Sequence, residues 1–473
     1  MTTPAPRRFR IITFGCQMNE YDSDIMRGVL QARGLVETPE DDDADVVLVN
    51  TCAVRDGAEE RAIARLESLR PLKKRRDAIL GMTGCVAQEH GAKILDRLPF
   101  LDLVIGTRDL LKVGNLIEEI WRTGQRVVSV EDIDSPLPLP VHVVSRSRPL
   151  KAHVTIMLGC DKACTYCIVP KTRGREWSRP MGEILEEIRH LVLHGYREVM
   201  LLGQNVNSYR DRDARSPFID AGLSAEPGIG DFPVLLREVD ALGARIEAET
   251  NGEHRLDRIR YTTSHPIDAT DALWRAMAEA PRVCPQIHLP VQAGNDRILR
   301  RMKRLYRRED YLQRVRSLRQ HLPHAVITTD IIVGFCGETD EEFEDTLSLV
   351  REVRFDAAFM FMYSPRAGTP SAEHLPDDVP MEVKKERLQR LIALQEGIAL
   401  EKNQARVGQT FPVLVEGAAK YPEGFASGRT PGDIIVNFPG DATQLTGHIV
   451  PVTITEASSH SLRGEPALTP AGV

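Results

Sequence analysis

The sequence predicts an α/β fold with three parts: an N-terminal parallel α/β domain, a central TIM-like βα barrel, full or partial, and a small C-terminal all-β barrel of OB-like size. Three observations lead to this prediction. Strand-like apolar runs alternate with helical patterns through residues 10–121, and the alternation resumes on a larger scale in residues 151–376. Short strands separated by Gly and Pro turns fill residues 408–466. Alternating β and α elements are typical of parallel sheets, whereas successive short strands are typical of barrels.

The bulk composition indicates a globular protein with several domains. The chain has 473 residues, too many for one hydrophobic core, and 27% of them are charged. No apolar run approaches the ~18 residues of a membrane span, and the start, MTTPAPRRFR, lacks the apolar segment of a signal peptide. We therefore expect a cytoplasmic protein that does not associate with membranes. We also expect a monomer. The net charge of −7 argues against non-specific coating of nucleic acid, although basic runs begin at Arg70 and Arg297. Such runs are more often solvated helix faces than binding sites.

The N-terminal domain is predicted to cover residues 7–125. Its strand candidates are each followed by a helical or turn-rich stretch, and they are residues 10–14, 45–50, 78–84 and 101–106. A segment rich in Pro and Asp follows at residues 131–150, and this composition is typical of a linker.

The central barrel is predicted to cover residues 146–380. Its strand candidates are residues 153–158, 198–203, 258–264, 286–292, 326–335 and 357–364. Helical patterns such as residues 182–195 lie between them, as βα repeats require. The segment 210–258 is rich in Asp, Gly and Glu, and we interpret it as a surface insertion.

A connecting helix and a small barrel complete the chain. Residues 381–406 carry apolar residues at helical spacing, namely Leu388, Leu391, Leu394 and Ile398. The barrel is predicted to cover residues 407–467, with strands at 410–417, 424–430, 433–438 and 448–457.

Three cysteines in the N-terminal domain each follow a predicted strand. Cys16, Cys52 and Cys85 are separated by 36 and 33 residues, about one βαβ unit apiece. Residues just past the carboxyl ends of parallel strands gather at one edge of the sheet, so these thiols should converge. Free cysteines are often simply buried, but three at equivalent points of successive units favour metal binding. Cys284 and Cys336 lack such an arrangement, and core packing is expected for both.

A second triad, Cys160, Cys164 and Cys167, has the spacing Cx3Cx2C directly after the first strand of the predicted barrel. Structural zinc sites normally have four ligands, and no fourth Cys or His lies within reach of this loop. Three thiolates can hold a four-iron cluster and leave one iron open to a chelating ligand. S-adenosylmethionine, through its amino and carboxylate groups, is such a ligand.

The sequence resembles the radical-SAM methylthiotransferase family, and most closely its tRNA-2-methylthio-N6-dimethylallyladenosine synthase branch (MiaB type). The resemblance covers nearly the whole chain. It is carried by FGCQMNEYDSD, NTCAVRDGAEE, GCDKACTYCIVPKTRGREWSRP, LLGQNVNSY, RIRYTTSHP, HLPVQAGNDRILRRMKR and DIIVGF. The tail, with SGRT and VNF, resembles the RNA-binding TRAM domain. The departures are Cys336, where the family has proline, and the long 210–258 segment.

The resemblance implies a transferase that modifies tRNA with two [4Fe-4S] clusters and two S-adenosylmethionine molecules. One molecule would be cleaved to a 5′-deoxyadenosyl radical that takes hydrogen from C2 of N6-isopentenyladenosine at position 37. The other would methylate a sulfur bound to the cluster on Cys16, Cys52 and Cys85, which is then transferred to C2. The partners implied are tRNA, a flavodoxin- or ferredoxin-like electron donor and a sulfur donor.

Further site residues follow from the same resemblance. The cofactor-binding candidates line the predicted barrel mouth, and they are Tyr166, Gly203, Gln204, Asn205, His288, Gln292 and Val333. The candidates for contacts to tRNA phosphates are Arg173, Arg175, Arg179, Arg429 and Arg463, the last two in predicted turns. The polar candidates could bind the cofactor, or they could only form ordinary hydrogen bonds at the mouth of the barrel. The first three arginines could equally brace the cluster loop, and the small barrel could be a stability cap.

Three other functions stay open at this point. The same chemistry could act on N6-threonylcarbamoyladenosine in tRNA, or on an aspartate of a ribosomal protein. GCQMNEYDS, QNVNSY and YTTSHP favour the tRNA branch over the ribosomal one. A non-enzymatic iron–sulfur carrier or a zinc-bound RNA-binding module would not need a βα array of barrel length.

Overall fold

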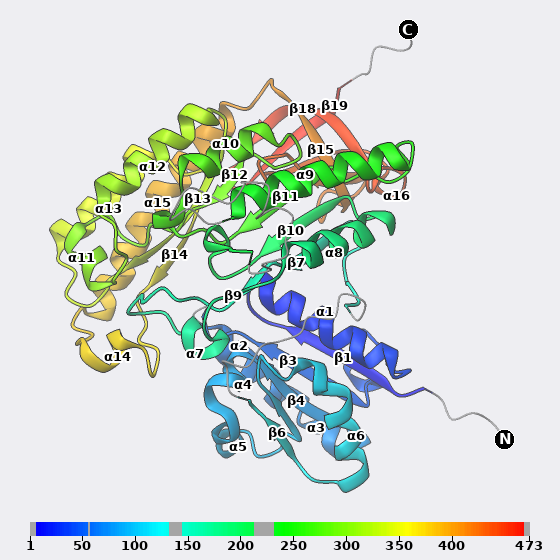
Figure 1. Cartoon of the computed structure of the whole chain (residues 1–473). Coiled ribbons are helices and arrows are strands. Elements are labelled where there is room, and N and C mark those ends of the chain that lie inside the picture. Colours follow the sequence, from blue (N-terminus) through cyan, green and yellow to red (C-terminus); the bar gives the residue numbers. More distant parts are fainter. Residues whose placement is uncertain (1–5, 55–56, 132–143, 212–230, 468–473) are drawn as a thin grey trace.

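The structure is a computed structural model that describes residues 6–54, 57–131, 144–211 and 231–467. Figure 1 shows the N-terminal domain in blue and cyan on one side of the central core, and the C-terminal barrel in red on the other. This three-part α/β architecture confirms the predicted fold class. Most of the predicted linker and residues 212–230 of the predicted insertion lie outside the described residues.

The N-terminal domain is built on one parallel sheet with the spatial order β2-β1-β3-β4-β5-β6. Its strands are β1 (Arg8–Thr13), β2 (Val36–Glu37), β3 (Val46–Thr51), β4 (Ile79–Gly84), β5 (Leu103–Ile105) and β6 (Val127–Ser129). Strands β2 and β6 were not predicted, because two or three residues at a sheet edge are too few to show the alternation of a strand. The central strands β3 and β4 are buried along their whole length, as expected for a sheet covered on both faces.

Helices cover the sheet, and one of them also contacts the central core. They are α1 (Gln17–Ala32), α2 (Ala58–Leu69), α3 (Pro71–Arg76), α4 (Cys85–His90), α5 (Ile94–Arg97) and α6 (Val113–Thr123), with 3-10 turns η1 (Asp41–Asp43), η2 (Gly91–Lys93) and η3 (Leu110–Lys112). In Figure 1, α1 lies between the N-terminal sheet and the core, where it packs against β7 (Lys151–Thr155). This double contact buries polar α1 side chains such as Asn19 and Asp22.

The central core is an open, partial βα barrel. Two parallel three-stranded sheets, β11-β10-β7 and β12-β13-β14, meet through a bridge between Ile259 and Val283. The strands after β7 are β10 (Glu198–Leu202), β11 (Arg258–Thr262), β12 (Gln286–His288), β13 (Val326–Val333) and β14 (Ala357–Met362), and the pair β8 (Met157–Leu158) and β9 (Trp177–Ser178) lies beside the first loop. All six barrel strands match strands predicted from the sequence.

The helices of the core are α7 (Val169–Arg173), α8 (Met181–Leu193), α9 (Phe232–Glu249), α10 (Asp271–Glu279), α11 (Asp296–Arg301), α12 (Arg308–His321), α13 (Asp340–Val353) and α14 (Pro370–His374), with turns η5 (Val206–Ser208) and η7 (Pro266–Asp268). The interpretation of segment 210–258 as a surface insertion is wrong for its second half. Helix α9 lies there, packs between α8 and α10, and buries Leu235, Leu236 and Val239 in the core. It is the helix of the βα unit that joins β10 to β11. Among the described helices, none is both long and apolar enough to span a membrane.

Helix α15 (Met381–Gln404) connects the core to a closed barrel with the order β15-β16-β17-β19-β18. Its strands are β15 (Thr410–Ala418), β16 (Phe425–Arg429), β17 (Ile435–Pro439), β18 (Ile449–Ala457) and β19 (Ser461–Pro466), with the short helix α16 (Ala442–Leu445). Four strands match the prediction, and β19 lies where a turn is expected. Arg429 and Arg463 therefore lie in strands β16 and β19, not in the turns expected for them.

The C-terminal barrel docks on the core through two buried arginines of β11. Arg258 donates hydrogen bonds to the carbonyl oxygens of Arg429 (2.7 Å) and Pro412 (2.8 Å). Arg260 donates to those of Thr430 (2.9 Å) and Pro431 (2.8 Å) and pairs with buried Glu198 (3.1 Å). Because removing one partner of a buried charged network costs several kcal/mol, these contacts fix the barrel against the core.

Candidate functional site

One large cavity, of about 620 Å³, runs through the partial barrel. At the carboxyl ends of the strands it is lined by all six cysteines of the two predicted triads. At the opposite end it reaches the first residues of three strands, Gln286, Val326 and Ala357. There the C-terminal barrel contributes part of the wall, including Gly432 and His460.

The upstream triad comes from three separate βα junctions. Cys16 immediately precedes α1, Cys52 follows β3, and Cys85 is the first residue of α4 after β4. Hydrogen bonding to Cys52, together with burial, raises the pKa of the Cys16 thiol well above its usual value, so these two side chains are adjacent. The predicted convergence of the three cysteines on one edge of the sheet is therefore present in the fold.

Two glycines make this convergence possible. Gly15 has φ +125°, and a Cβ there would lie 2.5 Å from the Cβ of Cys52. Gly84 has φ +89°, and a Cβ there would lie 2.3 Å from Oδ1 of Asn50. Both positions combine a left-handed backbone with a space that no side chain can enter.

An asparagine pair ties the upstream loops together. Asn19 accepts a hydrogen bond from the Cys16 thiol (3.3 Å) and donates to Asn50 (3.2 Å) and to the carbonyl oxygen of Thr51 (2.8 Å). The Asn50 amide donates in turn to the Asn19 carbonyl oxygen (2.8 Å). Sequence reasoning missed both residues, although each lies within a family-like segment that contains a cysteine.

The downstream triad lies on a loop that is held at several points. The backbone N–H of Cys160 donates to the Gly174 carbonyl oxygen (3.1 Å), and that of Thr165 donates to the Met302 carbonyl oxygen (3.1 Å). Lys162 forms an ion pair with Asp268 (2.8 Å), which also accepts a hydrogen bond from Asn205 (2.7 Å). The loop is thus tied both to its own return segment and to the turn after β11.

The donor set of both triads consists of thiols, which hold iron–sulfur clusters when they are deprotonated. Burial raises the pKa of the Cys160 thiol to about 11 and that of the Cys167 thiol to about 12, so an added cation is needed to stabilise the thiolates. Within the described ranges, no group of three His, Cys, Asp or Glu side chains is close enough together to hold one metal ion. In a four-iron cluster each thiolate binds a different iron.

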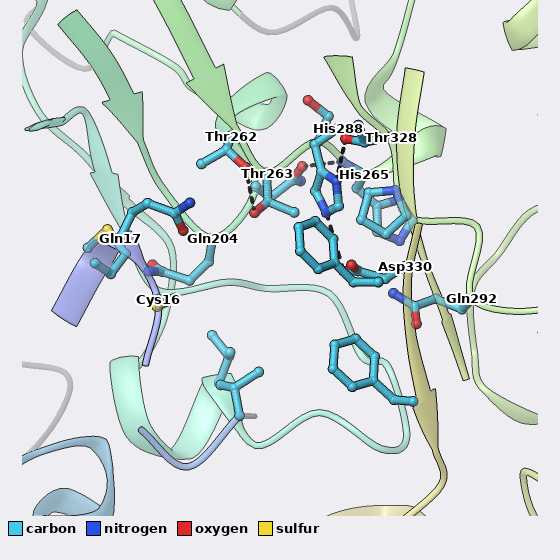
Figure 2. Close-up of a pocket in the computed structure, with 18 of the residues that line it drawn as sticks. Cys16, Gln17, Gln204, Thr262, Thr263, His265, His288, Gln292, Thr328 and Asp330 are labelled. Carbon is cyan, nitrogen blue, oxygen red and sulfur yellow. Dashed lines mark hydrogen bonds and ion pairs between the residues drawn. The ribbon is translucent and has the colours of Figure 1, made fainter. Parts of the chain in front are cut away.

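The strand end at Gly203–Asn205 presents an unused polar group to the cavity. Gln204 Oε1 is buried and has no hydrogen-bond partner among the described residues. Figure 2 shows Gln204, Cys16 and Gln17 on one side of the pocket, with His288 and Asp330 on the other. A buried acceptor without a partner is costly unless a ligand supplies a donor. By contrast, Asn205 is already committed to Asp268 and to the backbone N–H of His265 (2.9 Å).

The remaining cofactor-binding candidates divide into two groups. Tyr166, His288 and Gln292 line the cavity, and His288 is held by Thr328 (2.9 Å) and Asp330 (3.3 Å). Val333 does not line it and is fully buried in the hydrophobic core. Successive side chains of a strand face opposite sides, so Thr328, Asp330 and Ile332 of β13 face the cavity and Val333 faces away. Cys284 and Cys336 are buried, as expected.

The five candidate arginines lie in different environments. Arg173 is buried and paired with Asp22, and Arg179 is fully buried and paired with Glu187 (2.6 Å). Their burial favours the alternative that these two brace the region of the cluster loop. Arg175, whose side chain is 78% exposed, pairs with Asp161. Arg429 and Arg463 are partly exposed, and Arg429 pairs with Glu416 and Asp433.

His265 lies in the wall of the cavity and is kept neutral. Burial, reinforced by the charges of Arg304 and Lys162, lowers its pKa to about 2. Its Nδ1 accepts a hydrogen bond from the Ile267 backbone N–H (3.2 Å), and its ring packs edge-on against Tyr306. A protonated ring could not accept that bond.

This pKa predicts a specific loss of stability in acid. A histidine whose folded pKa is depressed stabilises the fold fully above its unfolded pKa of about 6.5, and this contribution is lost as the pH falls toward the folded pKa. Between pH 8 and pH 5 we expect a loss of about 2 kcal/mol from His265. His265→Asn should remove this part of the pH dependence of thermal unfolding, whereas the exposed His460→Asn should not. Equal pH dependence in wild type and His265→Asn would contradict the assignment.

Comparisons with known proteins give a consistent result. Family models match in order along the chain: "Uncharacterized protein family UPF0004" at residues 8–106, the Radical SAM superfamily at 154–350 and the TRAM domain at 404–467. Curated relatives named tRNA-2-methylthio-N(6)-dimethylallyladenosine synthase are 48% identical in Symbiobacterium thermophilum, covering 98% of this chain and 94% of that one, and 43% identical in Pelotomaculum thermopropionicum, covering 97% of both.

Solved structures show the same fold at low sequence identity. The radical S-adenosylmethionine methyltransferase TsrM from Kitasatospora setae, with cobalamin and a [4Fe-4S] cluster bound, has a TM-score of 0.54 at 13% identity and covers 89% of this chain and 80% of that one. The same enzyme with tryptophan and an S-adenosylmethionine analogue has a TM-score of 0.53 at 14% identity, covering 88% and 79%.

The partial βα barrel, with a cysteine triad after its first strand, defines a radical S-adenosylmethionine enzyme. Membership of this class implies S-adenosylmethionine and a [4Fe-4S] cluster. The chain belongs to the family of tRNA-2-methylthio-N(6)-dimethylallyladenosine synthases.

Proposed function

We propose that this protein catalyses methylthiolation of C2 of N6-isopentenyladenosine at position 37 of tRNA, giving 2-methylthio-N6-dimethylallyladenosine. The observation that carries the proposal is that both cysteine triads open onto one cavity large enough for a cofactor and a nucleobase together. A single triad would suffice for radical formation. A second one in the same cavity is what delivery of sulfur to the activated carbon requires.

Two [4Fe-4S] clusters are part of this proposal. Cys160, Cys164 and Cys167 would hold the first, and Cys16, Cys52 and Cys85 the second. When bound, the clusters and S-adenosylmethionine supply the radical that takes the C2 hydrogen and the methylated sulfur that replaces it. A protein purified without oxygen should then be brown and hold about eight irons per chain, which a zinc protein would not.

The residues of the chain position these groups. Gln204 Oε1, which is buried without a hydrogen-bond partner among the described residues, would accept a hydrogen bond from the ammonium group of S-adenosylmethionine. Tyr166, the Gly203–Asn205 strand end, His288 and Gln292 remain the proposed cofactor wall. Neutral His265 adds no positive charge next to a cationic cofactor.

The tRNA is proposed to bind along the basic groups that reach the surface, with Arg175, Arg429 and Arg463 as phosphate contacts. Phosphate contacts fix the register of a nucleic acid on a protein, and the target base must then leave its stack to reach the cavity. The TRAM-type barrel supports an RNA partner.

An electron donor of flavodoxin or ferredoxin type and a sulfur donor complete the proposed set of partners. The proposed domain boundaries are residues 7–125 for the N-terminal domain, 146–380 for the central core, 381–406 for the connecting helix and 407–467 for the C-terminal barrel.

The test is mass spectrometry of nucleosides from tRNA of cells that lack the protein. We expect 2-methylthio-N6-dimethylallyladenosine to disappear and N6-isopentenyladenosine to accumulate, with both changes reversed by wild type but not by Cys160→Ala. Loss of the methylthio derivative of N6-threonylcarbamoyladenosine instead would indicate the other tRNA substrate. Unchanged tRNA nucleosides would contradict the proposal.

A further inference from the structure

A buried arginine of the core points at the downstream cysteine triad. Arg304 is 5% exposed, and its Nη1 donates a hydrogen bond to Sγ of Cys164 (3.4 Å). Its other donors are fixed by the carbonyl oxygen of Pro290 (2.9 Å) and the hydroxyl of Tyr306 (3.0 Å). Arg304 therefore differs from neighbours in the same basic run, such as Arg307, which is exposed and paired with Asp310.

The charge of Arg304 is not balanced by a carboxylate. Within the part of the chain that the structure describes, Arg304 forms no ion pair with Asp or Glu. A buried guanidinium without a counter-ion costs several kcal/mol. The group that Arg304 does contact is Sγ of Cys164. When that sulfur binds a cluster as a thiolate, it and the cluster would supply the missing negative charge.

A second buried arginine, Arg173, belongs to the central core and lies close to the upstream triad of the N-terminal domain. Arg173 is the last residue of α7, six residues beyond Cys167, and it forms two hydrogen bonds to Asp22 of α1 (3.1 and 2.5 Å). Helix α7 packs against α4, which begins at Cys85, and Arg173 and Cys85 line the same cavity.

We propose that Arg304 and Arg173 are positioning residues, each of which holds a positive charge against one cysteine triad and raises the reduction potential of the iron–sulfur cluster bound there. Hydrogen bonds to cluster sulfurs and nearby charge are among the factors that set such potentials. Reduction adds an electron to the cluster, so a fixed cation favours the reduced form. The part of the proposal that concerns Arg173 rests on the proposed second cluster. Its effect should be the smaller one, because Asp22 already offsets the charge of Arg173.

The experiment is a redox titration followed by electron paramagnetic resonance, without tRNA or S-adenosylmethionine, on proteins with one cluster each. Arg304→Gln is made in the Cys16, Cys52 and Cys85 to alanine background, which retains the downstream triad. We expect its one-electron reduction equilibrium to shift at least tenfold toward the oxidised form, about 59 mV. Arg304→Lys keeps the charge and should remain within threefold of the parent. Arg307→Gln, a control in the same basic run, should not shift it.

Arg173 is tested in the complementary background, with Cys160, Cys164 and Cys167 replaced by alanine. Arg173→Gln is made in a protein that already carries Asp22→Asn, so that no buried carboxylate is left unpaired, and we expect it to lower the potential of the remaining cluster relative to Asp22→Asn alone. The control is Arg175→Gln, two residues further on and exposed. If Arg304→Gln leaves the potential unchanged, or the exposed controls shift it equally, the proposal is wrong. A wild type with only about four irons would overturn the second cluster and the Arg173 half with it, while the Arg304 titration would still decide its own half.

Discussion

Replacing Cys160, Cys164 and Cys167 together with alanine should abolish the reductive cleavage of S-adenosylmethionine to 5′-deoxyadenosine. The physical reason is that the open iron which would chelate the cofactor exists only if these three thiolates hold the cluster. The loop itself should stay folded, since Lys162 and Thr165 hold it through contacts that do not use a thiol. The measurement is chromatography of 5′-deoxyadenosine after anaerobic reduction with dithionite.

The complementary variant separates the roles of the two triads. Alanine at Cys16, Cys52 and Cys85 should halve the iron content yet leave cofactor cleavage detectable, because the downstream loop does not depend on these residues. Cys284→Ala serves as the control, since Cys284 is buried just before β12, at the amino ends of the barrel strands, and should leave the iron content at the wild-type value. An upstream triple variant with as much iron as wild type would show that the second cluster is wrongly assigned.

Replacing Arg260 with alanine should strongly destabilise the folded protein and loosen the C-terminal barrel from the core. The change removes a buried ion pair to Glu198 and two hydrogen bonds to the C-terminal barrel, and it leaves the Glu198 carboxylate short of a partner. Breaking a buried pair from one side costs about 3–5 kcal/mol. Hydrogen exchange of amides in residues 410–466 and the thermal unfolding midpoint would report the loss.

The matched control is Arg255→Ala. Arg255 lies three residues before β11, is partly exposed and pairs with Asp257 at 3.2 Å. Surface substitutions of this kind usually change stability by less than about 0.5 kcal/mol. Equal thermal unfolding midpoints for the two variants would show that the contact between the C-terminal barrel and the core does not depend on Arg260.

The position of each cysteine could be predicted because it follows from strand order alone. A parallel sheet places the residues after its strands at one edge, and GC or TC directly after an apolar run is visible in the sequence. The face of a strand is also readable: the alternation in VITTDIIV places Thr328 and Asp330 on one side. The assignment of Val333 to the cofactor ignored this alternation, and the structure places its side chain in the core.

Other features depend on the tertiary fold and leave little trace in the sequence. Helix α9 was hidden because its acidic and Gly-rich surroundings resemble a surface loop, although PVLLREVDAL carries apolar residues at helical spacing. Nothing local distinguishes Arg304 from the other basic residues of its run, because its burial depends on the loop of Cys164, 140 residues earlier. The same holds for Arg173 and its partner on α1.

The composition of the cavity wall has a consequence for the order in which it is completed during synthesis. Both cysteine triads lie within the first 167 residues, whereas the C-terminal barrel contributes wall residues from Arg429 onward. The core strands are complete at Met362, the end of β14, and at about 5–20 residues per second roughly 3–13 s pass before Arg429 is made. During that interval the nascent barrel is open at the amino ends of its strands, on the side away from the cysteines. The interior is closed there only when β16 and β17 emerge and the arginines of β11 find their carbonyl partners.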